Sequence, residues 1–186
     1  ELQVIKDIFD HSWCLTCTLH YEGASFYLDE PRTQRLQLRF DEDGQINILK
    51  VQRDPVAEKI VKHHLKQFGI LHKKGHTYTI PVSKDASNEA IEWVVNNRAA
   101  LEELGFTVLS PALEDKPVNL DKPILQLEAS TYQDWFDIYG IIKLGKFQIP
   151  FLDIAKNIRA NDPYFPLPDG SVFIIPEEWM ERYRGI

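Results

Sequence analysis

The segment with the most suggestive chemical spacing runs from Gly140 to Lys146 and reads Gly-Ile-Ile-Lys-Leu-Gly-Lys. This is the spacing of a phosphate-binding loop, in which backbone N–H groups cradle phosphates and the lysine reaches the outer ones. A magnesium-binding Ser or Thr must follow the lysine, but Phe147 stands there. The alternating pattern also predicts a hairpin, whereas such a loop needs a strand-to-helix turn. We therefore expect Lys146 to bind no ATP and the chain to hold no cofactor.

Cys14 and Cys17 have the spacing of a thiol redox motif. They fall within an alternating run from Trp13 to Tyr21, which predicts a strand. Residues three apart in a strand point to opposite faces, so these thiols cannot easily pair or share a metal ion. We interpret both cysteines as small buried hydrophobic residues.

Four histidines, His63, His64, His72 and His76, raise the question of a zinc site, because imidazole is a common zinc ligand. His63 and His64 lie on different sides of a predicted helix. His72 and His76 flank a predicted hairpin, with no cysteine or carboxylate close in sequence. His64 falls on the apolar side, where a hydrogen-bonded core residue is the ordinary role. We predict no metal site.

Serine, histidine and aspartate residues are all present, but they form no recognisable hydrolase motif. The chain has no G-x-S-x-G elbow, no H-E-x-x-H sequence and no placed pair of carboxylates. Glu177 and Glu178 begin a predicted helix, where negative charge stabilises the positive end of the helix dipole. We expect no catalytic residue in this chain. The alternative is a stand-alone small enzyme, a hydrolase whose site these motifs do not capture.

A basic segment lies within an acidic chain. The formal net charge is −7, yet residues 50–76 hold seven Lys and Arg against two Asp and Glu, a net charge of +5. Part of this segment is a predicted amphipathic helix at about residues 55–68, with apolar residues on one side and basic residues opposite. The candidate phosphate contacts are Lys59, Lys62, Lys66, Lys73 and Lys74. The alternative is a solvated helix face, and the overall charge excludes a protein that is basic throughout.

The elements that position these residues are mostly short strands joined by tight turns. Alternation around turns that contain glycine predicts hairpins at residues 13–28, 36–51 and 135–149, near Lys74-Gly75 and near Asp169-Gly170. Capping residues and helical spacing predict helices at about 55–68, 88–104 and 150–160 and from about Pro176. Adjacent strands without strict strand-helix alternation favour an α+β fold of mainly antiparallel strands and hairpins with flanking helices.

Pro111, Pro117 and Pro123 punctuate a stretch that has no hydrophobic period. We predict an N-terminal α+β module at residues 1–112, a Pro-containing linker at 113–123 and a small C-terminal α+β module at 124–186.

The C-terminal stretch carries four motifs in a fixed order, namely Trp135-Phe136-Asp137, the segment 145–150, Leu167-Pro-Asp-Gly-Ser171 and Pro176-Glu-Glu-Trp179. This order resembles the accessory region found just before the motor in bacterial Swi/Snf-type helicase-like ATPases. Residues 104–111 are similar to the strand that ends the preceding module there. The resemblance covers about residues 100–186 well and the first hundred residues by the order of elements only.

The resemblance implies a parent protein that hydrolyses ATP, with magnesium, to translocate on duplex DNA. No Walker-type lysine loop, D-E-x-H box or arginine-finger motif occurs here, so the motor activity is assigned to no residue of this chain. The implied role is a non-catalytic accessory region that positions DNA or a partner for a helicase-like motor in the same parent chain. We expect the reading frame to continue past Ile186 into helicase motifs.

The composition is that of a soluble globular protein, with 44% hydrophobic and 26% charged residues. The longest apolar runs are far shorter than the roughly 20 residues of a bilayer span. Residue 1 is Glu and no secretory signal is visible, while two cysteines without a disulfide pattern are typical of a reducing compartment. We expect a cytoplasmic segment of a longer protein, with no membrane partner.

Overall fold

The structure, a computed structural model, describes residues 1–82, 88–132 and 135–185, and the side chains of residues 127–139 lie outside this description. Trp135, Phe136 and Asp137, the first motif of the resemblance, are among those side chains. Four helices and many antiparallel strands in small sheets make up the described chain. The predicted α+β class is therefore confirmed.

The chain divides into two compact units. Unit 1 comprises Glu1–Lys84 and Ala99–Leu109, and unit 2 comprises Asp85–Arg98 and Ser110–Ile186. The boundary passes through helix α2 (Glu89–Glu103). Unit 2 thus draws residues from both sides of the predicted 113–123 linker.

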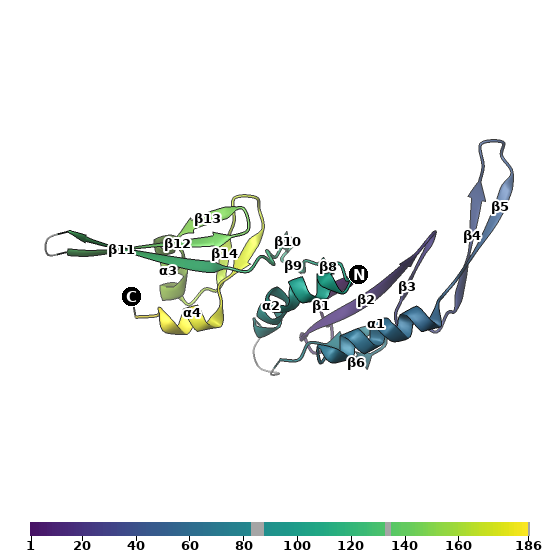
Figure 1. Cartoon of the computed structure of the whole chain (residues 1–186), viewed down its shortest axis with the longest axis horizontal. Coiled ribbons are helices and arrows are strands. Elements are labelled where there is room, and N and C mark those ends of the chain that lie inside the picture. The colour runs from purple at the N-terminus through teal and green to yellow at the C-terminus, as the bar shows by residue number, and fades with distance from the viewer. Residues whose placement is uncertain (83–87, 133–134, 186) are drawn as a thin grey trace. The chain divides into compact units, whose positions relative to one another are not determined.

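Unit 1 is built on a six-stranded sheet in the order β6-β7-β2-β1-β8, with β3 paired to β2 (Figure 1). Strands β1 and β8 run parallel, and the other neighbours run antiparallel. Strand β2 has three partners, and its residues from Cys14 to Cys17 are buried on both faces. The bounds are β1 Leu2–Lys6, β2 Trp13–Tyr21, β3 Ala24–Tyr27, β6 Leu71–Lys74, β7 Thr77–Thr79 and β8 Val108–Leu109.

Unit 1 also contains a separate two-stranded hairpin, β4 (Gln34–Phe40) and β5 (Ile46–Gln52), followed directly by helix α1 (Pro55–Gln67). The Asp54 side chain caps α1 by accepting hydrogen bonds from the N–H groups of its first turn at 2.9 and 3.1 Å. The helix buries Leu65 but leaves Val56 and Ile60 exposed, although the sequence places them on its apolar side. Glu58, whose side chain is only 12% exposed, lies seven residues before Leu65 and so on the same side of the helix, which is therefore the side that faces inward.

Unit 2 packs a three-stranded antiparallel sheet, β11-β12-β13, against helix α3. Ile142 and Leu144 of β12 and Ile149 of β13 are buried with Ile154 and Ile158 of α3. A second hairpin and helix α4 complete this core. The bounds are β11 Ile124–Tyr132, β12 Trp135–Leu144, β13 Phe147–Pro150, α3 Phe151–Ala160, β14 Tyr164–Pro166, β15 Val172–Ile174 and α4 Glu177–Arg182.

The predicted linker carries structure of its own. Strands β9 (Ala112–Leu113) and β10 (Lys116–Pro117) form a small antiparallel hairpin. Val118 then bridges Val172 of β15, and both Val118 and Leu120 are buried. The sequence has no visible period here because the buried positions are isolated between prolines and charged residues.

Candidate functional site

The structure pairs Lys73, one of the five candidate phosphate contacts, with acidic residues of its own unit. Its Nζ lies 2.9 Å from Asp7 Oδ2 and 2.7 Å from Asp10 Oδ2, and it donates a hydrogen bond of 3.0 Å to Ser12 Oγ. The hydrogen bonds that Lys73 donates to Asp10 and Asp7 raise the pKa of Lys73. They also lower the pKa of the Asp10 carboxyl group, and they add to the Phe9 N–H bond that lowers the pKa of Asp7. The charge of Lys73 is therefore already used within the unit.

Lys62 is paired in the same way, with its Nζ 2.5 Å from Asp29 Oδ1. Asp29 also accepts a hydrogen bond from the hydroxyl group of Tyr78. Lys59 and Lys66 of α1 and Lys74 of β6 are exposed, and the described residues place no carboxylate against them. Lys74 Nζ lies 5.7 Å from the ring centre of Phe9. Three of the five predicted lysines thus present a free charge to an approaching phosphate.

The segment with phosphate-loop spacing forms the predicted hairpin, because Gly145 and Lys146 make the turn between β12 and β13. Lys146 Nζ lies 3.2 Å from Asp169 Oδ2 and over the Phe147 ring. No helix begins at this turn to direct N–H groups at a phosphate.

Cys14 and Cys17 are free thiols with exposed fractions of 0% and 1%. Burial raises the pKa of both thiols, that of Cys17 to about 11. The histidines are dispersed: His72 Nε2 lies 3.0 Å from the Gly75 carbonyl oxygen, and His76 stacks on Tyr27 with ring centres 4.4 Å apart. Within the described ranges, no three His, Cys, Asp or Glu side chains are grouped to hold a metal ion.

A surface that the sequence analysis does not single out lies on the β4–β5 hairpin. The strand register pairs Phe40 with Ile46 and Leu38 with Ile48, and Leu36 lies one rung further from the turn, opposite Lys50. Paired residues share a face of an antiparallel ladder, so these five apolar side chains lie together. They are 60–70% exposed. We call this set, Leu36, Leu38, Phe40, Ile46 and Ile48, the β4–β5 apolar face.

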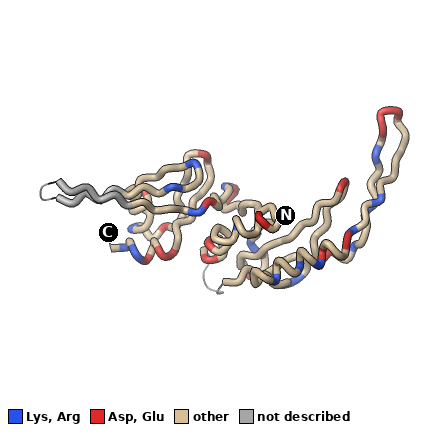
Figure 2. The backbone as a smooth tube through the Cα atoms, viewed as in Figure 1, with Lys and Arg blue, Asp and Glu red and all other residues tan. Residues whose placement is uncertain are grey.

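The opposite side of the hairpin contacts the β2–β3 turn near Leu49 and Gln37. Gly23, in the β2–β3 turn at φ +88°, lies close to the hairpin. A Cβ atom at this position would be 2.7 Å from Leu49 Cδ2 and 2.9 Å from Gln37 Oε1. Only glycine tolerates both this positive φ and a neighbour at this distance. Figure 1 shows the hairpin extending beyond the end of α1, and Figure 2 shows acidic residues at its tip.

The base of the hairpin is fixed by Arg53, the residue that follows β5. Its Nε and Nη2 donate to the two carboxylate oxygens of Glu58 at 2.7 and 2.8 Å, and the two side chains are only 8% and 12% exposed. The remaining guanidinium N–H groups reach backbone carbonyls of residues 28–32, including Leu28 O at 2.6 Å. The Tyr21 hydroxyl also donates to Glu58, at 2.9 Å. One buried ion pair therefore connects the hairpin, the start of α1 and the loop before β4.

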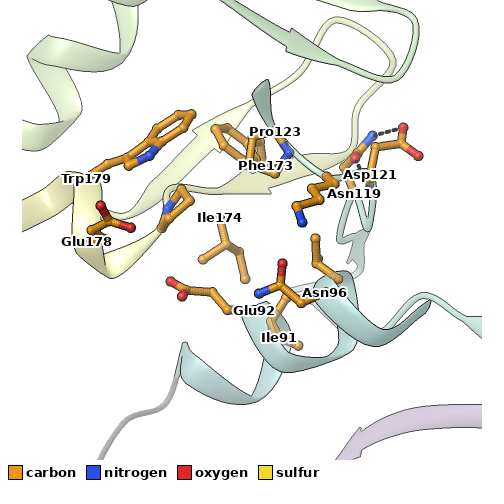
Figure 3. Close-up of a pocket in the computed structure, with 13 residues that line it drawn as sticks. Ile91, Glu92, Asn96, Asn119, Asp121, Pro123, Phe173, Ile174, Glu178 and Trp179 are labelled. Carbon is orange, nitrogen blue, oxygen red and sulfur yellow. Dashed lines mark hydrogen bonds between the residues drawn. The ribbon is translucent and has the colours of Figure 1, made fainter. Parts of the chain in front are cut away.

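Unit 2 contains a small cavity of about 180 Å³ (Figure 3). Ile91, Phe173 and Trp179 supply apolar walls, and Asn96 and Glu92 supply polar groups. Glu92 Oε1 accepts a hydrogen bond of 2.6 Å from the Glu177 N–H, while burial, with neighbouring glutamates, raises the pKa of its carboxyl group. The cavity is smaller than the roughly 300 Å³ at which drug-sized ligand sites begin, so it fits a single side chain better than a nucleotide.

Two of the C-terminal motifs, Leu167-Pro-Asp-Gly-Ser171 and Pro176-Glu-Glu-Trp179, have structural roles in unit 2. Ser171 donates from both its N–H and its hydroxyl to Asp169 Oδ1, at 3.1 and 2.6 Å, which closes the β14–β15 turn. Trp179 packs edge-to-face on Phe173, with ring centres 6.4 Å apart.

No family model, no curated protein and no solved structure matches the chain. Within the described ranges, no helix is both long enough and apolar enough to cross a membrane.

Proposed function

We propose that this chain is a non-catalytic accessory region of a Swi/Snf-type DNA-dependent ATPase, and that it contacts a partner protein through the β4–β5 apolar face. The order of the C-terminal motifs supports the family. In this proposal, the motor of the parent protein binds ATP and magnesium. The parent protein is cytoplasmic.

The exposure of the β4–β5 apolar face is the observation that carries the contact role. Contiguous exposed apolar patches of several hundred Å² mark interaction surfaces in soluble proteins. The Arg53–Glu58 pair and the Gly23 turn hold the base and the back of the hairpin in place. A partner therefore meets a surface that is already ordered, which reduces the entropy lost on binding.

DNA is the weaker candidate for the main contact. Lys62 and Lys73 are paired with Asp29, Asp7 and Asp10, which leaves three of the five candidate lysines unpaired, and the chain has a net charge of −7. Asp41, Glu42 and Asp43 at the hairpin tip repel phosphates. We expect DNA binding to be weak, independent of sequence and detectable at low salt.

The test uses the parent protein. The reading frame past Ile186 should encode helicase motifs, and a stop codon there contradicts the family assignment. In that parent, the double variant Leu38→Asp/Ile48→Asp should lower DNA-stimulated ATP hydrolysis by about tenfold, equivalent to about 1.4 kcal/mol of lost coupling, without changing nucleotide affinity.

Leu152→Asp is the matched control, because Leu152 of α3 is 69% exposed but lies in unit 2. It should leave the stimulated rate unchanged. A double variant that hydrolyses ATP at the wild-type rate contradicts the contact role.

A further inference from the structure

The β4–β5 hairpin lacks the cover that a two-stranded sheet ordinarily needs. Strands β4 and β5 pair only with each other within the described chain, so both have an open edge. A two-stranded hairpin is marginally stable in water unless its apolar face packs against something. One face contacts the turn at Gly23, and the β4–β5 apolar face has no partner among the described residues of unit 1. The β4–β5 apolar face is therefore a candidate docking surface.

The size of the face indicates what covers it. A large apolar side chain contributes on the order of 100 Å², so five of them at 60–70% exposure offer roughly 500–600 Å². Two such faces bury about 1,000–1,200 Å² together, which is the lower limit for a specific protein–protein interface. The partner must therefore contribute about the same area, as the identical face of a second copy would.

The charges at the two ends of the face are complementary to each other. Lys50 lies on the same face as Leu36 and Ile48, at the end nearer the hairpin base. Glu42 and Asp43 lie at the other end, in the turn, and both are exposed. A two-fold axis through the Leu38–Ile48 rung places the Lys50 end of one hairpin opposite the acidic tip of another. The same axis places the Phe40–Ile46 rung opposite the smaller Leu36–Lys50 rung.

We propose that the β4–β5 apolar face binds the same face of a second copy of this chain, in an antiparallel arrangement with two-fold symmetry. The interface is isologous: each copy contributes the five apolar side chains to the centre, and a Lys50–acidic tip contact forms at each end. This inference rests on the proposed role of the face as a contact surface, and it names the occupant.

Sedimentation equilibrium of the 186-residue chain tests the dimer. The wild type should pass from 21.6 kDa to twice that mass with a Kd on the order of 10 μM, in the range of weak, reversible association. Leu38→Asp/Ile48→Asp should raise Kd at least about 100-fold, because two carboxylates are buried without partners. Leu152→Asp should leave Kd unchanged. A wild type that stays at 21.6 kDa far above this concentration overturns the proposal.

Charge reversal tests the two-fold arrangement without touching the apolar centre. Lys50→Glu alone, or Glu42→Lys/Asp43→Lys alone, should weaken the dimer about tenfold, since each homodimer then has like charges at both ends. An equimolar mixture of these two variants should restore the wild-type Kd, because both ends of the mixed dimer carry opposite charges. A mixture no tighter than its components overturns the antiparallel arrangement.

The outcomes separate this inference from the proposed function. A monomeric wild type combined with loss of DNA-stimulated ATP hydrolysis in the Leu38→Asp/Ile48→Asp parent keeps the contact role and rejects the second copy. A dimer that Leu38→Asp/Ile48→Asp does not weaken rejects this face as the interface.

Discussion

Two hairpins of this chain share a sequence pattern and differ in what covers them. Both β4–β5 and β12–β13 alternate around a turn that contains glycine. In unit 2, Ile142 and Leu144 of β12 are fully buried with α3. In unit 1, Leu38 and Ile48 are 60% and 68% exposed. Alternation thus determines which residues share a face, whereas the rest of the fold determines whether that face is covered.

The largest expected effect is a difference in the free energy of unfolding between one substitution in β12–β13 and one in β4–β5. Leu144→Ala should lower the free energy of unfolding by about 3 kcal/mol, because it leaves a cavity in a packed core. Leu38→Ala should lower it by less than about 0.5 kcal/mol at concentrations where the chain is monomeric, because Leu38 is solvated. Urea unfolding, followed by tryptophan fluorescence and circular dichroism, measures both values. Equal losses would remove the distinction between the two hairpins.

The next effect concerns the base that positions the exposed hairpin. Arg53→Ala should cost about 2–3 kcal/mol of unfolding free energy, because it strands the Glu58 carboxylate and three backbone carbonyls. Arg32→Ala is the control: Arg32 is 71% exposed and 3.7 Å from Glu30, so its loss should cost less than about 1 kcal/mol. An Arg53 variant as stable as the Arg32 variant would show that the buried pair does not hold the hairpin.

The sequence predicts local structure well where the responsible residues are neighbours. Asp54 and Pro55 at one end and Gly69 at the other predict α1 nearly to the residue. The α+β class follows from the glycine turns. Strand β1 is not expected, because Leu2–Lys6 becomes a strand through pairing with β2 and β8.

The candidate site is less predictable, because it depends on contacts between distant residues. Lys73 is paired with Asp7, 66 residues away, which no local pattern reveals. The exposure of Leu38 depends likewise on distant parts of the chain, because no element in the described part of unit 1 covers it. Alternation alone is identical in a covered and an uncovered strand.

A smaller effect concerns DNA binding, which we expect at Lys59, Lys66 and Lys74 and not at the β4–β5 hairpin. At low salt, DNA binding should show a log–log salt slope near −2.7, from about three phosphate contacts. Lys59→Ala, Lys66→Ala and Lys74→Ala should each flatten the slope by about 0.9. Lys73→Ala should not, because Lys73 is held by Asp7 and Asp10. If all four variants match the wild type, or if none binds, the helix face is merely solvated.

The smallest expected effect concerns Glu92 of unit 2, whose carboxyl group is partly buried beside other glutamates. The folded state raises the pKa of Glu92, so the folded state holds this proton more tightly than the unfolded state. Glu92 is therefore neutral at low pH. As the pH rises through the raised pKa, the carboxyl group ionises in the folded state, and this ionisation lowers the stability of the fold. Glu92→Gln should be slightly more stable than the wild type at pH 8 and equal to it at pH 4, by thermal unfolding. The exposed Glu181→Gln is the control, because Glu181 does not contribute to the raised pKa of Glu92. A Glu92→Gln variant that is less stable than the wild type at pH 8 contradicts this assignment.

Hydrogen exchange at two protein concentrations tests most directly whether the β4–β5 apolar face is a contact surface. Mass spectrometry would follow the amides of residues 34–40 and 46–52 alongside those of 140–150, below and above the dimer Kd. We expect the protection of β4–β5 to rise with concentration, because a covered hairpin opens less often, and the protection of β12–β13 to stay constant. Protection of β4–β5 that is the same at both concentrations, in a chain that sediments as a dimer, would contradict it.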